Sequence, residues 1–105
     1  MTRVDTRDES AIRAKLEESI GPVVATDLHA HLKRDGVFVV APALSLLECG
    51  VAIAMDDATK VEAWVASGGL RRPTPEERAE WLASTDRSWN AIVVQPFVLV
   101  QDLPG

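Results

Sequence analysis

Residues 91–101, AIVVQPFVLVQ, are the stretch that decides the fold, because nine of these eleven residues are apolar and most of the nine are β-branched or aromatic. Such a composition predicts a buried strand over residues 92–100. Apolar side chains stand at both alternating positions, so both faces of this strand need a cover. Pro96 has no N–H group to donate, which predicts an edge position or a bulge that divides the strand.

The rest of the chain predicts few strands to pair with this one. Residues 37–40, VFVV, form a second strand, and residues 70–72 are either a very short third strand or a crossing loop. We therefore expect an α+β fold, a small helix-rich single domain with about five helices and a sheet of two to three strands. Capping residues, glycines and prolines predict where the helices begin and end. The five expected helices run from residues 8–10 to about residue 20, from Thr26 or Asp27 to Gly36, over residues 46–55, from Asp57 to Gly68, and from Thr74 to about residue 84.

The helix over residues 46–55 is expected at the centre of the core. Ser45 and Glu48 form a capping-box pattern at its start. After Glu48 its only polar residue is Cys49, and a helix that is apolar on all sides belongs inside a protein.

Length and composition describe an ordinary globular chain. The 105 residues, 47% hydrophobic and 26% charged, suit one domain over residues 9–102, preceded by a disordered segment over residues 1–8. The net charge of −5 argues against a dedicated nucleic-acid-binding protein. No apolar run approaches the roughly 20 residues that a membrane-spanning helix needs. A single cysteine, Cys49, excludes an internal disulfide and fits the reducing cytoplasm.

A set of positions spread from about Ile12 to Gln101 has the spacing of a known family, namely Ser45, Leu46, Leu47, Glu48, Asp56, Asp57, Val61, Trp64, Gly68 or Gly69, Leu70, Trp81 and the closing block of residues 93–101. On these positions the chain resembles the bacterial domain-of-unknown-function 2288 family. Members usually carry aspartate where this chain has Ser45, and either residue caps a helix well. The resemblance implies a small soluble bacterial protein and supplies no activity.

Few residues offer chemistry. His29 and His31 lie two positions apart on a predicted helix and point about 200° apart, so they do not bind one metal ion together. We predict no metal site and no cofactor, since no other Cys or His spacing completes a site. Glu48, Asp56 and His31 are the candidates for a catalytic site, although helix capping already explains Glu48.

A second set of residues is suited to lining a ligand pocket or an interface. Tryptophans also fill cores, and a buried glutamine amide needs partners in a strand pair, an interface or a ligand. The members of this set are Trp64, Trp81, Trp89, Gln95, Phe97 and Gln101.

Three functions follow from these patterns. The first is a non-catalytic homodimeric interaction or regulatory module, in which a second copy covers the two-sided final strand. The second is a small-ligand-binding protein with a Trp- and Gln-lined pocket. The third is an enzyme that uses Glu48, Asp56 or His31.

Overall fold

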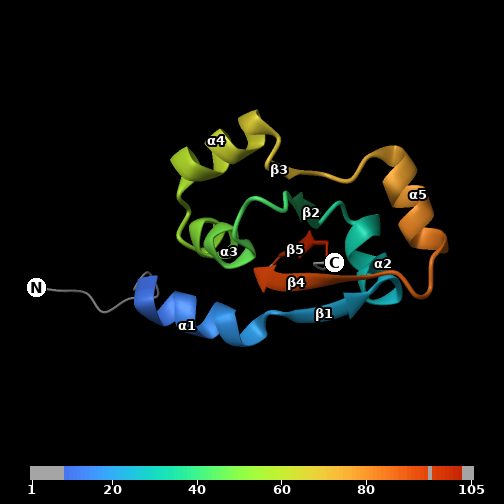
Figure 1. Ribbon diagram of the computed structural model, residues 1–105, viewed down its shortest axis with the longest axis horizontal. Coiled ribbons are helices and arrows are strands. Elements are labelled where there is room, and N and C mark those ends of the chain that lie inside the picture. The colour runs from blue at the N-terminus through green and yellow to red at the C-terminus, as the bar shows by residue number, and fades with distance from the viewer. Residues whose placement is uncertain (1–8, 95, 103–105) are drawn as a thin grey trace, which may run out of the picture.

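A computed structural model describes residues 9–94 and 96–102 of the chain, and within them it contains five helices and one five-stranded mixed sheet (Figure 1). The predicted α+β class is confirmed, whereas the predicted sheet of two to three strands is wrong. In chain order the elements are α1 (Glu9–Ser19), β1 (Gly21–Val24), α2 (Ala25–Lys33), β2 (Val37–Val40), α3 (Leu46–Ala54), α4 (Ala58–Ser67), β3 (Leu70–Arg71), α5 (Pro75–Ala83), β4 (Ser88–Val94) and β5 (Phe97–Gln101).

The apolar stretch that decides the fold forms two strands and not one. β4 and β5 pair antiparallel with Val94 opposite Phe97, so residues 95–96 join the two strands of a hairpin. Pro96 therefore lies between the strands, where no ladder hydrogen bond is required of it. The hairpin occupies the middle of the sheet, whose strand order is β1-β4-β5-β2-β3, and β2 pairs parallel with β5.

The strand β1 was missing from the sequence prediction. Its four residues GPVV pair antiparallel with residues 88–91 of β4 at the edge of the sheet, a position that tolerates Pro22. The strand leads directly into α2, which begins at Ala25 and not after Thr26 or Asp27. Asp27 still caps this helix, because its Oδ2 accepts a hydrogen bond from the Val24 N–H at 3.2 Å.

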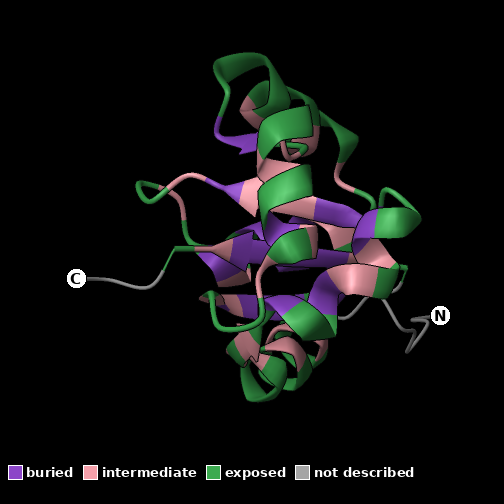
Figure 2. Cartoon of the chain, turned by 90° about the vertical axis from the view of Figure 1, so that its right-hand side faces the viewer, coloured by how far each residue is buried: buried purple, intermediate pink, exposed green. Residues whose placement is uncertain are grey.

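The helices cover both faces of the sheet. α2 and α5 lie on one side of it and α3 and α4 on the other (Figure 1), and the buried parts of the chain gather in the strands between them (Figure 2). We call the first the α2–α5 face, with the buried residues Ala25, Leu28, Leu32, Val37, Trp81, Trp89, Ala91, Val98 and Val100. We call the second the α3–α4 face, with the buried residues Val40, Leu46, Cys49, Leu70, Ile92, Val94 and Leu99. Both faces of the central hairpin are thus covered within one chain.

The apolar helix α3 lies between α1 and α4 and packs on β4 and β5. Ser45 caps it as the sequence predicts, since its Oγ accepts a hydrogen bond from the Glu48 N–H at 3.1 Å. The predicted capping box is only half formed, because the Glu48 carboxylate binds the Arg13 guanidinium of α1 instead. Gly50 allows the close approach to the sheet, because a Cβ at this position would stand 3.1 Å from the Cδ1 of Ile92.

Candidate ligand-binding site

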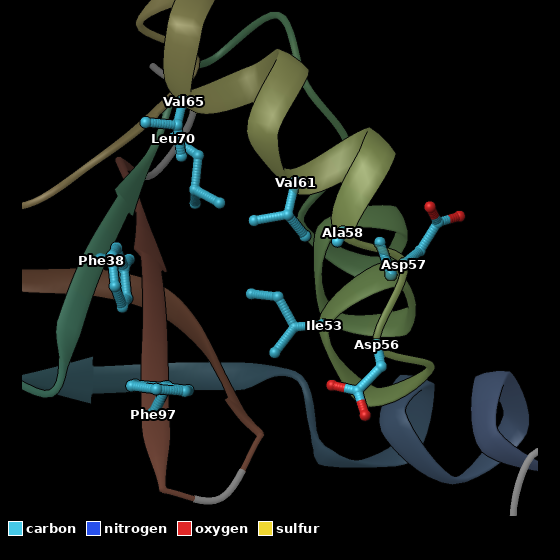
Figure 3. A pocket seen from close by; sticks show the side chains of 10 residues that line it. Phe38, Ile53, Asp56, Asp57, Ala58, Val61, Val65, Leu70 and Phe97 are labelled. Atoms are coloured by element: carbon cyan, nitrogen blue, oxygen red, sulfur yellow. The ribbon is translucent and has the colours of Figure 1, made fainter.

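A cavity of about 330 Å³ opens on the α3–α4 face, between the sheet and the two helices (Figure 3). Its volume lies within the roughly 300–1,000 Å³ range of small-molecule sites. Eight of its ten lining residues are apolar, and the full lining is Phe38, Ala52, Ile53, Asp56, Asp57, Ala58, Val61, Val65, Leu70 and Phe97.

Two phenylalanines form the sheet wall of this pocket. Phe38 lies on β2 and Phe97 begins β5, and because these strands are neighbours the two rings meet at the sheet surface. The ring centroids are 5.4 Å apart and the planes are inclined at 75°, an edge-to-face arrangement. Figure 3 shows Ile53 and Val61 on the other side of the space, so the pocket is bounded by rings on one side and aliphatic side chains on the other.

On the helix side, the pocket stays open because α4 does not pack closely against the sheet. None of its ten residues is buried. Val61 and Trp64 are half-buried, and Val65, which lines the pocket, is 53% exposed. Gly68 ends the helix at a φ of 83°, a left-handed conformation that glycine adopts without strain.

The two acidic lining residues serve the turn between α3 and α4. Asp56 has a φ of 58°, so it reverses the chain in the left-handed conformation. Asp57 caps α4, because its Oδ1 accepts a hydrogen bond from the Lys60 N–H at 3.2 Å, and its other oxygen lies 3.9 Å from the Lys60 Nζ. Figure 3 shows both carboxylates on the turn side of Ile53, outside the space between the phenylalanines and Val61.

The tryptophans that the sequence singles out do not share one site. Trp81 and Trp89 are buried together on the α2–α5 face, with ring centroids 4.8 Å apart at 66°. The guanidinium of Arg87 lies over both rings. Trp64 packs on the opposite face of the sheet and is not part of the pocket lining.

Phe97, another member of this set, lines the pocket. Gln101 is engaged by the fold, because its Nε2 donates hydrogen bonds to the carbonyl oxygens of Ala41 at 2.9 Å and Leu44 at 2.7 Å. These bonds tie β5 to the loop between β2 and α3. Gln95 lies outside the described residues.

The three candidate catalytic residues lie in separate places. Glu48 binds the Arg13 guanidinium of α1, and this hydrogen-bonded partner lowers the pKa of the Glu48 carboxyl. Asp56 stands at the pocket rim. His31 belongs to α2 beyond the sheet, where its Nδ1 lies 3.1 Å from the Nη2 of Arg34.

The structure groups no metal-binding set among residues 9–94 and 96–102, since nowhere there do three His, Cys, Asp or Glu side chains come together. Cys49 is fully buried, and this burial raises the pKa of its thiol to about 11. A thiol of that pKa stays protonated at neutral pH and is a poor nucleophile.

The sequence did not single out Phe38, Val61, Val65 or Leu70 as site residues. Each of them reads as an ordinary apolar position of a strand or a helix face. Their shared role depends on β2, β3 and α4 meeting in space, and the spacing of residues along the chain carries no signal for that.

The fold and the pocket define a small α+β protein with an apolar cavity the size of a ligand site. The chain belongs to the family described as protein of unknown function (DUF2288), which matches residues 11–102. The predicted resemblance is confirmed. No match was found among curated proteins.

One solved structure is similar over almost the whole chain. The NMR solution structure of PA1075 from Pseudomonas aeruginosa is 30% identical in sequence, with a TM-score of 0.75. The match covers 99% of this chain and 95% of that chain. Among the helices that the structure describes, none is both long and apolar enough to cross a membrane.

Proposed function

We propose that this protein is a non-catalytic binding protein whose site is the pocket between Phe38, Phe97 and α4. The observation that carries the proposal is a cavity of about 330 Å³ with eight apolar lining residues out of ten. Apolar surface that stays uncovered costs free energy, roughly 25 cal/mol for each Å², so an apolar ligand that enters this space gains affinity from its own burial. Of the three predicted functions, ligand binding is the one that this cavity supports, with phenylalanines in its described lining in place of the expected tryptophans.

The position of the functional groups supports binding over catalysis. Glu48 is held by Arg13, His31 lies beyond the sheet, and Asp56 stands at the pocket rim apart from both. General acid–base chemistry needs such groups within hydrogen-bond reach of one substrate. Eight of the ten residues that line the pocket are instead apolar, and such a lining recognises a ligand by its shape and by apolar contact.

A neutral fluorescent dye tests this proposal directly. Prodan, a naphthalene dye whose body is two fused rings, brightens in apolar surroundings and carries no charge, so its binding depends on the pocket and not on ion pairing. We expect a saturable, one-to-one rise in fluorescence with the native protein. No saturable rise would contradict the proposal.

Matched tryptophan substitutions locate the dye. Val61→Trp fills the pocket from α4 and should abolish the rise, whereas Glu62→Trp adds the same side chain to the exposed side of the same helix and should not. Val65→Trp, at an exposed lining position, repeats the first test without disturbing a half-buried site. Equal dye binding by all three variants would place the dye elsewhere.

A homodimer remains a second proposal. The two-sided apolar strand suggested it from the sequence, and the exposure of Val93 supports it in the structure. Both faces of the β4–β5 hairpin are covered by the chain itself, so the hairpin no longer demands a partner. Val93 nevertheless stays 42% exposed, on the part of β4 that extends past its pairing with β1. A light-scattering mass of twice the 11.4 kDa of one chain would support a dimer through this end of β4, and a mass of one chain would remove it. The cytoplasmic location stays a prediction.

A further inference from the structure

We propose that the natural ligand of this pocket is an amphipathic carboxylate, with its apolar body between the phenylalanines and α4 and its carboxylate at Arg72. The inference rests on the proposed ligand-binding function and adds the class of ligand. An apolar cavity of roughly 150 Å³ accommodates benzene, so the 330 Å³ here suits an apolar body of about ten carbon atoms or two fused rings.

Arg72 stands next to the pocket on the same face of the sheet. In the β2–β3 pair Val39 is opposite Arg71 and Val40 is opposite Leu70, so Arg72 follows on the side of Leu70 and Phe38. Its Cζ lies over the Phe38 ring, 4.8 Å from the centroid. The guanidinium is thus one aromatic ring away from the interior of the pocket.

The charge of Arg72 is available, in contrast to that of the arginines around it. Arg71 pairs with Glu77, Arg78 with Asp35 and Arg87 with Asp102. Over residues 9–94 and 96–102, no carboxylate forms an ion pair with Arg72, whose Nη1 donates to the Asp35 carbonyl oxygen at 2.6 Å. A guanidinium has five N–H donors, so the others remain for a carboxylate.

The acidic residues at the opposite end of the pocket favour one orientation of a carboxylate ligand. Asp56 and Asp57 stand at the α3–α4 turn, away from the phenylalanines (Figure 3). Two carboxylates repel an anionic group at that end, whereas Arg72 attracts it at the sheet end. A carboxylate ligand therefore places its apolar tail toward Ile53 and its head toward Phe38 and Arg72.

Three probes with the same chain and different head groups test this inference, namely octanoate, 1-octanol and octylammonium. Titration calorimetry at pH 7 measures the dissociation constant of each for the native protein and for Arg72→Gln. We expect Arg72→Gln to weaken octanoate about fivefold or more and to leave octanol within twofold. Arg71→Gln is the matched control, because that guanidinium is engaged by Glu77, and it should change neither constant.

The outcomes separate the ligand class from the existence of the site. Octanoate and octanol weakened equally by Arg72→Gln would overturn the carboxylate and leave an apolar pocket. Octylammonium as the tightest of the three would overturn it in favour of the acidic turn. If none of the three binds, and the neutral dye also fails to bind, the pocket itself is not a ligand site.

Discussion

The two faces of the sheet carry the same kind of apolar cover but differ in how completely it fills the space. On the α2–α5 face, Trp81 and Trp89 are about 2% and 1% exposed, and their rings pack edge to face at the centre of the cover. On the α3–α4 face, α4 buries none of its residues, and a cavity separates it from the phenylalanines below. One face uses large aromatic side chains to complete the core, and the other leaves room for a molecule from outside.

The attachment of the two outer helices differs in the same way. α5 begins with a complete capping box, in which Thr74 and Glu77 exchange hydrogen bonds, and Glu77 also binds the guanidinium of Arg71 in β3. α4 begins with the single cap of Asp57 and ends at Gly68, in the left-handed conformation. A well-attached helix suits the filled α2–α5 face, and a helix with fewer attachments, such as α4, can adjust to a ligand.

The largest expected effect compares the same substitution on the two faces. Trp81→Ala removes a buried indole from the α2–α5 face and should lower the free energy of unfolding by about 3–5 kcal/mol. Trp64→Ala removes a half-buried indole from α4, so a loss of about 1–2 kcal/mol is expected. Urea unfolding followed by circular dichroism measures both. Equal losses would show that the two faces are packed equally well.

The next effect tests how closely α3 lies on the sheet. A Cβ at Gly50 would already stand 3.1 Å from Ile92, so Gly50→Val should push α3 outward and cost about 2 kcal/mol. Ala54→Val, at an exposed position of the same helix, provides the control and should cost less than about 0.5 kcal/mol. A neutral Gly50→Val would mean that α3 has room to move, which would blur the difference between the faces.

The sequence predicted the parts of this fold that depend on neighbouring residues. The helix caps at Ser45, Asp57 and Thr74 form as predicted, because each needs only a side chain and an N–H three residues later. The strand β1 was missed, since its four residues GPVV form a strand only because β4 offers them an edge. The hairpin was predicted as one strand, because a continuous apolar stretch does not show where the chain turns.

The pocket lay further beyond the reach of the sequence. Its walls come from Phe38, Val61, Leu70 and Phe97, which belong to β2, α4, β3 and β5. The sequence singles out Phe97, whereas Phe38, Val61 and Leu70 look like ordinary core positions. The space between them results from α4 standing off the sheet, a property of three-dimensional packing that no local pattern encodes.

A smaller effect concerns the attachment of α5 and depends on pH. Hydrogen bonds from Arg71 lower the pKa of the Glu77 carboxyl to about 2, from an ordinary value of 4.5. Since the folded state holds this group ionised, its contribution is complete above pH 4.5 and disappears as the pH falls toward 2. Glu77→Gln keeps an amide for the capping box but removes the ion pair, so it should cost about 1 kcal/mol at pH 7, because both partners are partly exposed.

The measurement is the stability difference between Glu77→Gln and the native protein across pH 2–7. We expect the difference to stay constant above pH 4.5 and to shrink steadily below it. Lys60→Gln is the matched control on α4, where the ion pair with Asp57 is long at 3.9 Å. Its effect should be within about 0.3 kcal/mol at every pH. A larger effect for Lys60 than for Glu77 would reverse the proposed contrast between the two helices.

The smallest expected effect has the opposite sign and distinguishes a binding site from a packing defect. Val61→Phe places additional carbon in the cavity of about 330 Å³ that Phe38 and Phe97 bound on the other side. Filling an apolar cavity should raise the free energy of unfolding by about 0.5 kcal/mol, which corresponds to an increase of about 2–4 °C in the melting temperature. The same variant should lose affinity for the neutral dye, because the added ring occupies the ligand's place. A gain in stability together with a loss of binding means that the chain leaves the α3–α4 face unfilled for a ligand. A loss of stability would show instead that the space is already taken up by the motion of α4, and that the two faces are closer in packing than their static structures indicate.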